Sequence, residues 1–334
     1  MIPTDALTHP TDAAAVTHAL VEAAAAAGHA PSIHNTQPWR WRLAGNTLDL
    51  YLERSRVLDV TDPDTRLATL SCGAALHHAR VSLAAQGWHV EVARMPDPED
   101  PDHLARLSPA GRVPVELPSL RRLQTVRLRR TDRRPVTGEP VATADLQAVA
   151  ADVEAEDTWL HVLTSDQVLD LAGAADHAQR TEVGETAWQT ELAYWTGGTR
   201  PAGTGIPDAA IPDRTIRTTV PGRNFGHPGA LPISSGQDRA AIFAMLYGRT
   251  DELVSWLRAG EALSAGWLTA TELGVSLLPF SAPIEVISTR QAMRVIIAST
   301  GYPYLVVRLG HFNATEAGPP HAPRLPTDQI IDRA

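Results

Sequence analysis

Two segments far apart in the chain share one spacing of small residues. The first reads Gly-Ala-Ala-Leu at residues 73–76 and reaches Gly87, and the second reads Gly-Glu-Ala-Leu at residues 260–263 and reaches Gly274. In each case the last glycine closes a predicted helix that leads into an apolar strand. Equal offsets at two places are typical of an internal duplication. The pattern therefore predicts two related α+β halves that differ in their additions.

The bulk composition excludes several classes of protein. The chain has 334 residues, which suits about two domains of roughly 100–200 residues each. All 29 basic residues are arginine, so no lysine is available for a Schiff base, a phosphate-binding P-loop or general-base chemistry. The formal net charge of −9 disfavours nucleic acid and anionic membrane surfaces as partners.

The cysteine and histidine content argues against disulfides and metal centres. Cys72 is the only cysteine, so no intrachain disulfide or thiolate zinc site can form, and its small neighbours predict a buried core position. The 13 histidines are scattered without metal-ligand spacing, so no metal is predicted. The sequence shows no basic leader and no apolar run near the roughly 18 residues of a membrane span. We expect a cytoplasmic protein without a membrane segment.

Periodicity and chain-breaking residues place most of the secondary structure. Helices are predicted over residues 13–27, 66–86, 117–130, 166–194 and 251–273, with another from about 143. Strands are predicted over residues 88–94, 159–163, 240–247 and 304–309, and a hairpin is predicted to turn at Gly45-Asn46. Residues 196–236 are rich in Gly, Pro, Thr and Arg, and a loop of this length is expected to be a lid or a linker.

A polar segment follows the first predicted helix. Residues 30–39 read Ala-Pro-Ser-Ile-His-Asn-Thr-Gln-Pro-Trp. Pro31 and Pro38 stiffen this loop, while Ser32 and Asn35 place hydrogen-bonding groups on a fixed backbone. By composition alone, the segment is a polar turn between a helix and a hairpin.

A second segment concentrates positive charge at a predicted helix end. Five arginines occur among the eight residues 127–134. Such a cluster can clamp a phosphate or carboxylate, bind nucleic acid, or form a solvated face paired with acids. The net charge of −9 favours a small anion over a polyanion. The segment also lacks the interleaved aromatic residues that stack on nucleic-acid bases.

Together the two segments resemble the nitroreductase family of FMN enzymes. That family carries an Arg-Arg-Ser-x-Arg run and an Ala-Pro-Ser-x-x-Asn-x-Gln-Pro-Trp loop; residues 30–39 match the loop at every fixed position, and residues 129–133 match the run with Thr131 for Ser. The chain further resembles the Acg-like branch, whose members are fused and carry a lid. The segments that support this narrower resemblance are residues 195–198, 205–208, 223–225, 256–263, 283–285, 304–310 and 323–331.

The order of the two motifs is inverted relative to the family. In the family the arginine run precedes the loop, and the FMN site lies at a homodimer interface. The resemblance therefore implies a fused pair of subunits with complementary losses: residues 1–117 keep the loop, with residues 8–12 in place of the arginine run, and residues 118–334 keep the run, with residues 154–158 in place of the loop. The implied fold is nitroreductase-like, with two halves that each hold an antiparallel-rich sheet flanked by helices, plus a lid at about 196–236. One FMN per chain and a monomer that acts as an internal pseudo-dimer are expected.

The resemblance also implies roles for particular residues. Arg129 is expected to bind the FMN phosphate, with Arg324 as a second candidate that could equally be a surface arginine. Arg133 is expected near flavin N1 and the C2 carbonyl, where a cation favours reduction. The remaining predicted cofactor-binding residues are Thr131 at the ribityl phosphate, Ser32 and Asn35 at the ribityl or pyrimidine edge, a Pro279-Phe280-Ser281 turn at N5 and O4, and the flanking Pro31, Ile33 and Arg130.

Two functions remain open on this basis. The first is an FMN oxidoreductase that takes hydride from NAD(P)H and passes electrons to a nitroaromatic or quinone by ping-pong kinetics, with no catalytic side chain because the flavin performs the hydride transfer. Gly203-Thr-Gly205 does not complete a dinucleotide-binding glycine motif, so the nicotinamide would stack transiently on the flavin. The second is a flavin-sequestering protein, in which the lid over FMN blocks substrate access.

Overall fold

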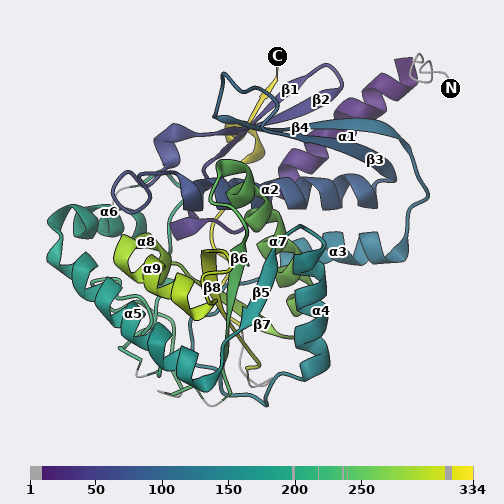
Figure 1. The fold of residues 1–334 in the computed structure, drawn as a ribbon. Helices are drawn as coiled ribbons and strands as arrows, with labels where there is room; N and C mark the ends of the chain where they lie inside the picture. The colour runs from purple at the N-terminus through teal and green to yellow at the C-terminus, as the bar shows by residue number, and fades with distance from the viewer. Residues whose placement is uncertain are drawn as a thin grey trace.

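A computed structural model of the chain describes residues 10–197, 200–216, 218–234, 237–238, 240–312 and 318–333. It contains two separate sheets with helices between and around them, which confirms the predicted α+β class (Figure 1). The strands of the first sheet are β1 (Trp39–Ala44), β2 (Thr47–Leu52), β3 (Trp88–Arg94), β4 (His103–Arg112) and β9 (Ile331–Arg333). The strands of the second are β5 (Trp159–Val162), β6 (Ile242–Gly248), β7 (Ser276–Phe280) and β8 (Tyr302–Gly310).

Helices make up the rest of the regular structure. They are α1 (Pro10–Ala27), α2 (Arg66–Ala85), α3 (Leu117–Leu128), α4 (Thr143–Glu154), α5 (Ser165–Gly184), α6 (Thr186–Thr196), α7 (Leu253–Glu272), α8 (Ala282–Glu285) and α9 (Ile287–Ile296). Short 3-10 turns lie at Ile33–Asn35, Arg54–Arg56, Asp208–Ala210 and Thr327–Gln329. Among the described residues, no helix is long and apolar enough to cross a membrane.

The two sheets have the same strand order. Leaving β9 aside, the first reads β3-β4-β2-β1 and the second reads β7-β8-β6-β5. In each half a long helix, α2 or α7, follows the second strand and precedes the third. The neighbouring strands within each set of four pair antiparallel. The prediction of two related halves with antiparallel-rich sheets is therefore confirmed.

Helices α2 and α7 cross where the duplicated glycines meet. A Cβ atom at Gly73 would lie 1.9 Å from a carbonyl oxygen of α7, and a Cβ at Gly260 would lie 1.8 Å from one of α2. Only glycine allows two backbones to approach this closely. One turn further along, at equal offsets, His77 Nδ1 and Ser264 Oγ are hydrogen-bonded at 2.8 Å. The repeat in the sequence thus marks an approximate two-fold relation at the centre of the molecule.

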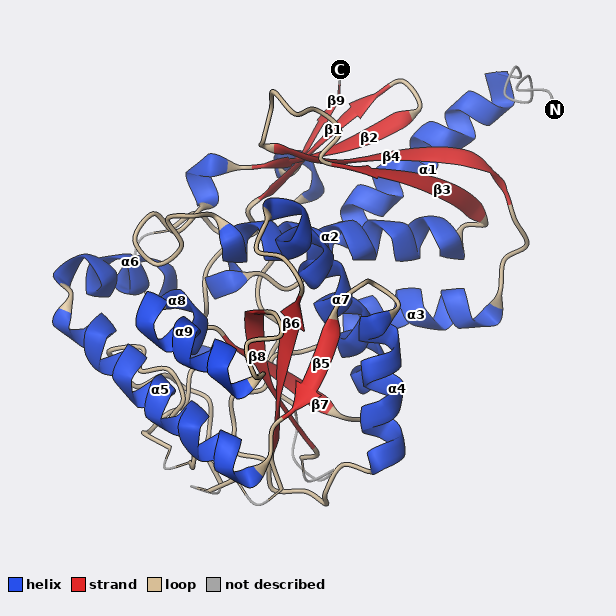
Figure 2. Ribbon diagram, viewed as in Figure 1, coloured by secondary structure: helices blue, strands red, loops and turns tan. Residues whose placement is uncertain are grey.

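The ends of these helices also match. Gly87 and Gly274 follow α2 and α7 with φ angles of 72° and 71°, the left-handed conformation that glycine adopts without a steric penalty. Each half has its own hydrophobic core, but the crossing helices serve both: Leu67 and Leu70 of α2 pack in the second core, and Leu257 of α7 packs in the first. Figure 2 shows α2 and α7 between the two sheets.

Some predicted elements differ from the structure. The single helix predicted over residues 166–194 is wrong, because Glu185 is extended (φ −106°, ψ 108°) and separates α5 from α6. Gly184, which ends α5, is a poor helix former and favours this break. Strands β4 and β9 and helices α8 and α9 were not predicted; β9 is only three residues long, too short for its pattern to show.

The C-terminal segment returns to the first half. Strand β9 pairs in parallel with β1, with Trp41 opposite Ile331, so the C-terminal segment lies beside the first strand of the chain (Figure 1). The predicted boundary between residues 117 and 118 falls at the start of α3 and stays a prediction. The crossing of β9 means that the first sheet is completed by residues from the second part of the chain.

The largest addition lies between β5 and β6. It comprises α5, α6 and residues 196–236, whereas β1 and β2 are joined by the predicted two-residue turn at Gly45-Asn46. Within the predicted lid, residues 198, 199, 217, 235 and 236 lie outside the described part of the chain. The remaining lid residues form a small apolar cluster of their own with α6, made of Leu192, Ile206, Ala210, Ile211 and Phe225.

Candidate functional site

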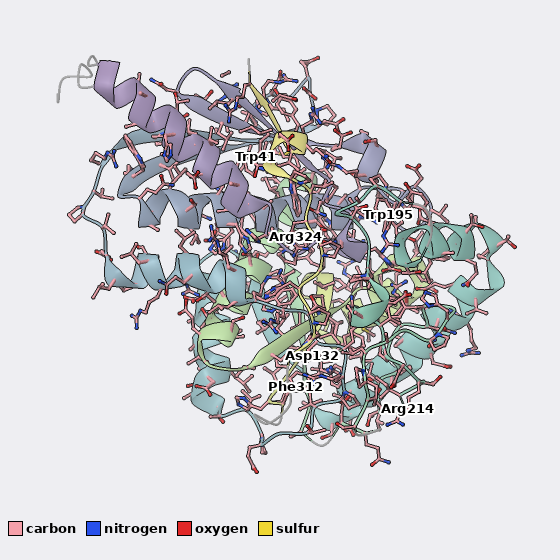
Figure 3. The ribbon with its side chains drawn as sticks, turned by 180° about the vertical axis from the view of Figure 1, so that it is seen from behind. Trp41, Asp132, Trp195, Arg214, Phe312 and Arg324 are labelled. Carbon is pink, nitrogen blue, oxygen red and sulfur yellow. The ribbon has the colours of Figure 1, made fainter. Side chains whose placement is uncertain are left out.

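A cavity of about 650 Å³ lies between the two halves. It is lined by the loop at residues 30–39, α2, the arginine run, the end of β7, the lid and the C-terminal segment. Figure 3 shows Arg324, one of its lining residues, near the centre of the molecule. The cavity brings together all the residues predicted to bind the cofactor: Pro31, Ser32, Ile33, Asn35, Arg129, Arg130, Thr131, Arg133, Pro279, Phe280, Ser281 and Arg324. Their roles toward a cofactor stay predictions.

The loop at residues 30–39 is held in an unusual backbone conformation. His34, Asn35 and Gln37 have φ angles of 44°, 58° and 54°, in the left-handed region that is costly for residues other than glycine. Side-chain hydrogen bonds stabilise this shape: Ser32 Oγ accepts from the Gln37 amide at 3.0 Å, and Ser71 Oγ on α2 accepts from the Ile33 amide at 3.2 Å. The loop is thereby fixed against α2 at one wall of the cavity.

Asn35 joins three segments of the chain. Its Nδ2 donates to the carbonyl oxygens of Gly205 (3.0 Å) and Pro323 (2.9 Å), and its Oδ1 accepts from Arg324 Nη1 at 2.6 Å. The backbone of Asn35 also accepts from the Gly205 amide at 3.1 Å. In this structure the side chain therefore orients Arg324 and ties the lid and the C-terminal segment to the first half.

Two arginines, the buried Arg129 and the partly buried Arg324, converge at one end of the cavity. Arg129 Nη2 and Arg324 Nη2 both donate to the carbonyl oxygen of His29, at 3.2 and 3.3 Å. Burial, followed by the charge of Arg324, lowers the pKa of Arg129 to about 9, and burial lowers the pKa of Arg324 to about 10. Neither forms an ion pair with a carboxylate of the described residues. The Nε and Nη1 atoms of Arg129 are buried and have no hydrogen-bond partner in the described structure.

The indole ring of Trp267 also contacts Arg129. The Arg129 guanidinium lies 4.3 Å from the centre of the Trp267 ring, a cation–π contact with α7. A cation held by an aromatic face and a single carbonyl remains able to donate hydrogen bonds to an incoming anion. This end of the cavity is therefore chemically suited to a phosphate group.

The other residues of the arginine run take different positions. Arg130 is exposed at the cavity mouth, where its Nε donates to His321 Nε2 at 3.1 Å. Arg133 donates to the lid carbonyl of Ala210 at 3.2 Å and lies 5.5 Å from the ring centre of Phe225. Burial, and then the charge of Arg223, lowers the pKa of Arg133 to about 10. Thr131 also lines the cavity.

The far wall of the cavity is formed by the end of β7. The predicted Pro279-Phe280-Ser281 turn is instead the last two residues of a strand followed by the residue before α8. Phe280 packs edge-to-face on Phe243, with ring centres 5.9 Å apart. The strand pairs with β8, so this wall is rigid.

Four cavity-side groups were missed as site residues by sequence reasoning. Arg223 of the lid donates to Glu182 of α5 at 3.2 Å and to Glu285 of α8, and the neutral His34 lies nearby on the loop. Burial raises the pKa of Glu182 to about 7 and lowers that of His34 to about 3. Arg223 and Glu285 stand in segments that supported the branch resemblance, so a signal existed for them. Glu182 lies in an ordinary helix, and its sequence gave no signal.

The lid forms part of the cavity wall. Lining residues come from 206–207, 210–212, 214–216, 218 and 221–228. Besides the contacts with Asn35 and Arg133, Gln37 Nε2 donates to the Gly203 carbonyl at 2.7 Å. The lid is thus bound to both halves in this structure.

Neither the histidines nor Cys72 form a second centre in the described residues. No group of three or more His, Cys, Asp or Glu side chains is placed to hold a metal ion there. Cys72 is buried, as expected, and burial raises the pKa of its thiol.

Similarity to individual known proteins places the chain in a family, whereas no family model matches it. The Mycobacterium tuberculosis (strain H37Rv) protein named "Putative NAD(P)H nitroreductase Rv3131" is 36% identical over 310 residues, covering 91% of this chain and 88% of that protein. "Putative NAD(P)H nitroreductase acg" from the same strain is 33% identical over 330 residues, covering 96% and 97%.

Solved structures show weaker likeness. A nitroreductase with bound FMN from Desulfitobacterium hafniense DCB-2 aligns with a TM-score of 0.39 and 15% identity, covering 63% of this chain and 96% of its own. The relatives above 30% identity span nearly the whole chain and carry the assignment. The chain belongs to the nitroreductase superfamily, in its Acg-like branch.

Proposed function

We propose that this protein binds one FMN between its halves and uses it to carry electrons from NAD(P)H to a small acceptor of the nitroaromatic or quinone type. The observation that carries the cofactor assignment is the pair Arg129 and Arg324, which share one carbonyl and have no carboxylate partner in the described structure. A dianionic phosphate would offset both charges and accept from the free Nε and Nη1 of Arg129.

The rest of the cavity suits the remainder of this cofactor. Its volume of about 650 Å³ lies within the roughly 300–1,000 Å³ common for small-molecule and cofactor sites. Arg133 would supply a cation at the pyrimidine edge, which favours the reduced flavin. The end of β7 would offer a rigid wall beside the redox-active edge.

The chain's own residues would position and shield the reaction. FMN, when bound, would supply the hydride chemistry, which no side chain of the protein performs. Arg129 and Arg324 would hold the phosphate. The strained loop at residues 30–39 would fix the position of the flavin ring in the cavity. The lid would exclude bulk water from the cavity. A nicotinamide would stack only transiently, since the chain lacks a dinucleotide-binding glycine motif.

The second candidate function is flavin sequestration. The lid is bound to Asn35 by two hydrogen bonds through Gly205 and to Arg133 through Ala210, and it forms a wall of the cavity. A lid that stays in this position would restrict the path of a second substrate to the flavin.

Anaerobic mixing of the FMN-loaded protein with NADH and with NADPH separates the two functions. The oxidoreductase proposal predicts that the yellow absorbance bleaches with at least one nicotinamide and returns when a quinone is added. Persistent yellow colour with both would contradict it and support sequestration. A protein that takes up no FMN at all would overturn both.

We further propose that the protein acts as a monomer in the cytoplasm. Both sides of the cavity come from one chain, so no second copy is needed to complete it. Light scattering after gel filtration is expected to give the mass of one chain, 35.9 kDa, and a dimer would contradict the pseudo-dimer proposal.

A further inference from the structure

Charge in the cavity is distributed very unevenly. The charged side chains that line it are mostly cationic: Arg129, Arg130, Arg133, Arg214, Arg223, Arg308 and Arg324. Glu182 is the only carboxyl side chain among the described lining residues. An isolated acid in a cationic cavity is either a simple counter-ion or a group that handles protons.

Glu182 does not act alone, because a second carboxyl group binds the same arginine. Glu182 and Glu285 come from α5 and α8, and their side chains are 5% and 0% exposed. Arg223 donates to one oxygen of each. The remaining oxygens, Glu182 Oε1 and Glu285 Oε2, are buried and find no donor in the described structure.

Both carboxyl groups share the guanidinium of Arg223 as their ion-pair partner. One arginine cannot neutralise two buried negative charges, and a buried carboxylate oxygen without a donor is costly. The pair therefore holds one proton while both groups face Arg223. Arg223 keeps the pKa of Glu285 low, and burial raises the pKa of Glu182 to about 7, so the proton belongs formally to Glu182.

Among the described residues around Glu182 and Glu285, no other group can serve as a buried proton donor. His34 faces the pair from the loop and is neutral, because burial and the charge of Arg223 lower its pKa to about 3. Asp62 is the other acid near Glu285, and burial raises its pKa to about 7, but it accepts from the Leu67 and Ala68 amides at the start of α2 and does not line the cavity. Arg133 lies beyond His34 and stays protonated at neutral pH.

Resting on the proposed function, we propose that Glu182, paired with Glu285, is the proton donor for the reduction that takes place in this cavity. A quinone that receives one hydride, whose source is NAD(P)H, becomes an oxyanion and needs one proton. The O–H bond of the Glu182 carboxyl breaks, its electron pair stays on the carboxylate, and a new O–H bond forms on the reduced quinone. Solvent returns a proton to the pair before the next turnover.

Carbon-13 NMR tests the shared proton without any cofactor. The protein is labelled at glutamate Cδ, so that Asp62 is silent, and titrated in the absence of flavin. We expect one coupled pair of signals to titrate near neutral pH, and to vanish in Glu182→Gln but persist in the exposed control Glu272→Gln. If every glutamate titrates near the ordinary value of about 4.3, the proposal is overturned, whatever the outcome for FMN binding.

Half-reaction kinetics test the donor role. Reduced, FMN-loaded protein is mixed with a quinone, which needs a proton, or with ferricyanide, which takes one electron and needs none. Glu182→Gln is expected to slow the quinone reaction at least about 100-fold and to leave the ferricyanide reaction unchanged. A donor role would be contradicted if the quinone and ferricyanide reactions slowed equally, or if neither slowed.

A second variant, Glu285→Gln, distinguishes a loss of proton donation from a loss of structure. In Glu285→Gln, Glu182 faces Arg223 without a second negative charge, so its pKa is expected to fall. The quinone reaction of this variant should be slow at neutral pH and recover as the pH is lowered. A rate that is low at every pH would mean that the pair serves only the structure, and would overturn the proposal.

Discussion

The two halves share a frame and differ in what is inserted into it. The first joins β1 to β2 with two residues and β3 to β4 with a short loop, whereas the second places α5, α6 and the lid between β5 and β6, and α8 and α9 between β7 and β8. Glu182, Arg223 and Glu285 all lie in these insertions. The duplicated frame therefore fixes where the cavity forms, and the insertions of one half supply its lid and its buried acids.

The first half contributes rigidity to the shared cavity. Its strained loop holds Asn35, which orients Arg324 from the far end of the chain. The second half contributes Arg129 and the lid. We therefore make separate predictions for the common frame, for the phosphate end of the cavity and for His77 at the helix crossing.

The largest effect is expected at the crossing of α2 and α7. Gly73→Ala would place a Cβ 1.9 Å from a backbone oxygen, so we expect a loss of about 3 kcal/mol or more of unfolding free energy. Gly173→Ala is the matched control, because a Cβ on that helical glycine meets no atom within 4 Å. It should be neutral or stabilising by about 0.4–1 kcal/mol. Equal urea midpoints for the two variants would contradict the close crossing.

A smaller effect is expected at the phosphate end of the cavity. Arg129→Ala removes a charge-assisted hydrogen-bond donor, so FMN binding should weaken by about 1.5–3 kcal/mol in a fluorescence titration. Arg121→Ala changes an exposed arginine of α3, the helix that Arg129 follows, and should leave the dissociation constant unchanged. If the two variants bind FMN equally well, the phosphate lies elsewhere.

The smallest effect, measured per pH unit, is expected at His77, which occupies in α2 the position that Ser264 occupies in α7. Burial lowers the pKa of His77 to about 3 from 6.5. Between those values the unfolded chain binds the extra proton, so stability falls as the pH drops below 6.5, by up to about 1.4 kcal/mol per pH unit from this group. His77→Asn should flatten the pH dependence of the urea midpoint by that amount, while the exposed His89→Asn should not. An unchanged slope would mean that His77 binds its proton equally in the folded and the unfolded chain, which would contradict the lowered pKa.

The sequence predicted the frame better than the chemistry of the insertions. Gly73, Gly260 and the closing glycines revealed the duplication because a close crossing and a left-handed cap each require glycine. The positions that line the cavity followed from motifs that match a known family. The acid pair could not be predicted, since Glu182 and Glu285 are 103 residues apart (285 − 182) and meet only through Arg223 on the folded lid. The break between α5 and α6 was missed because the helical pattern continues on both sides of Glu185.

The central claim is that two degenerate halves share one cofactor site. The most direct measurement is a stoichiometric titration of the protein with FMN, followed by flavin fluorescence, with protein concentration set by amino-acid analysis. Saturation is expected at one FMN per chain, in a particle that contains one chain. Two FMN per chain, or one FMN shared by two chains, would contradict it.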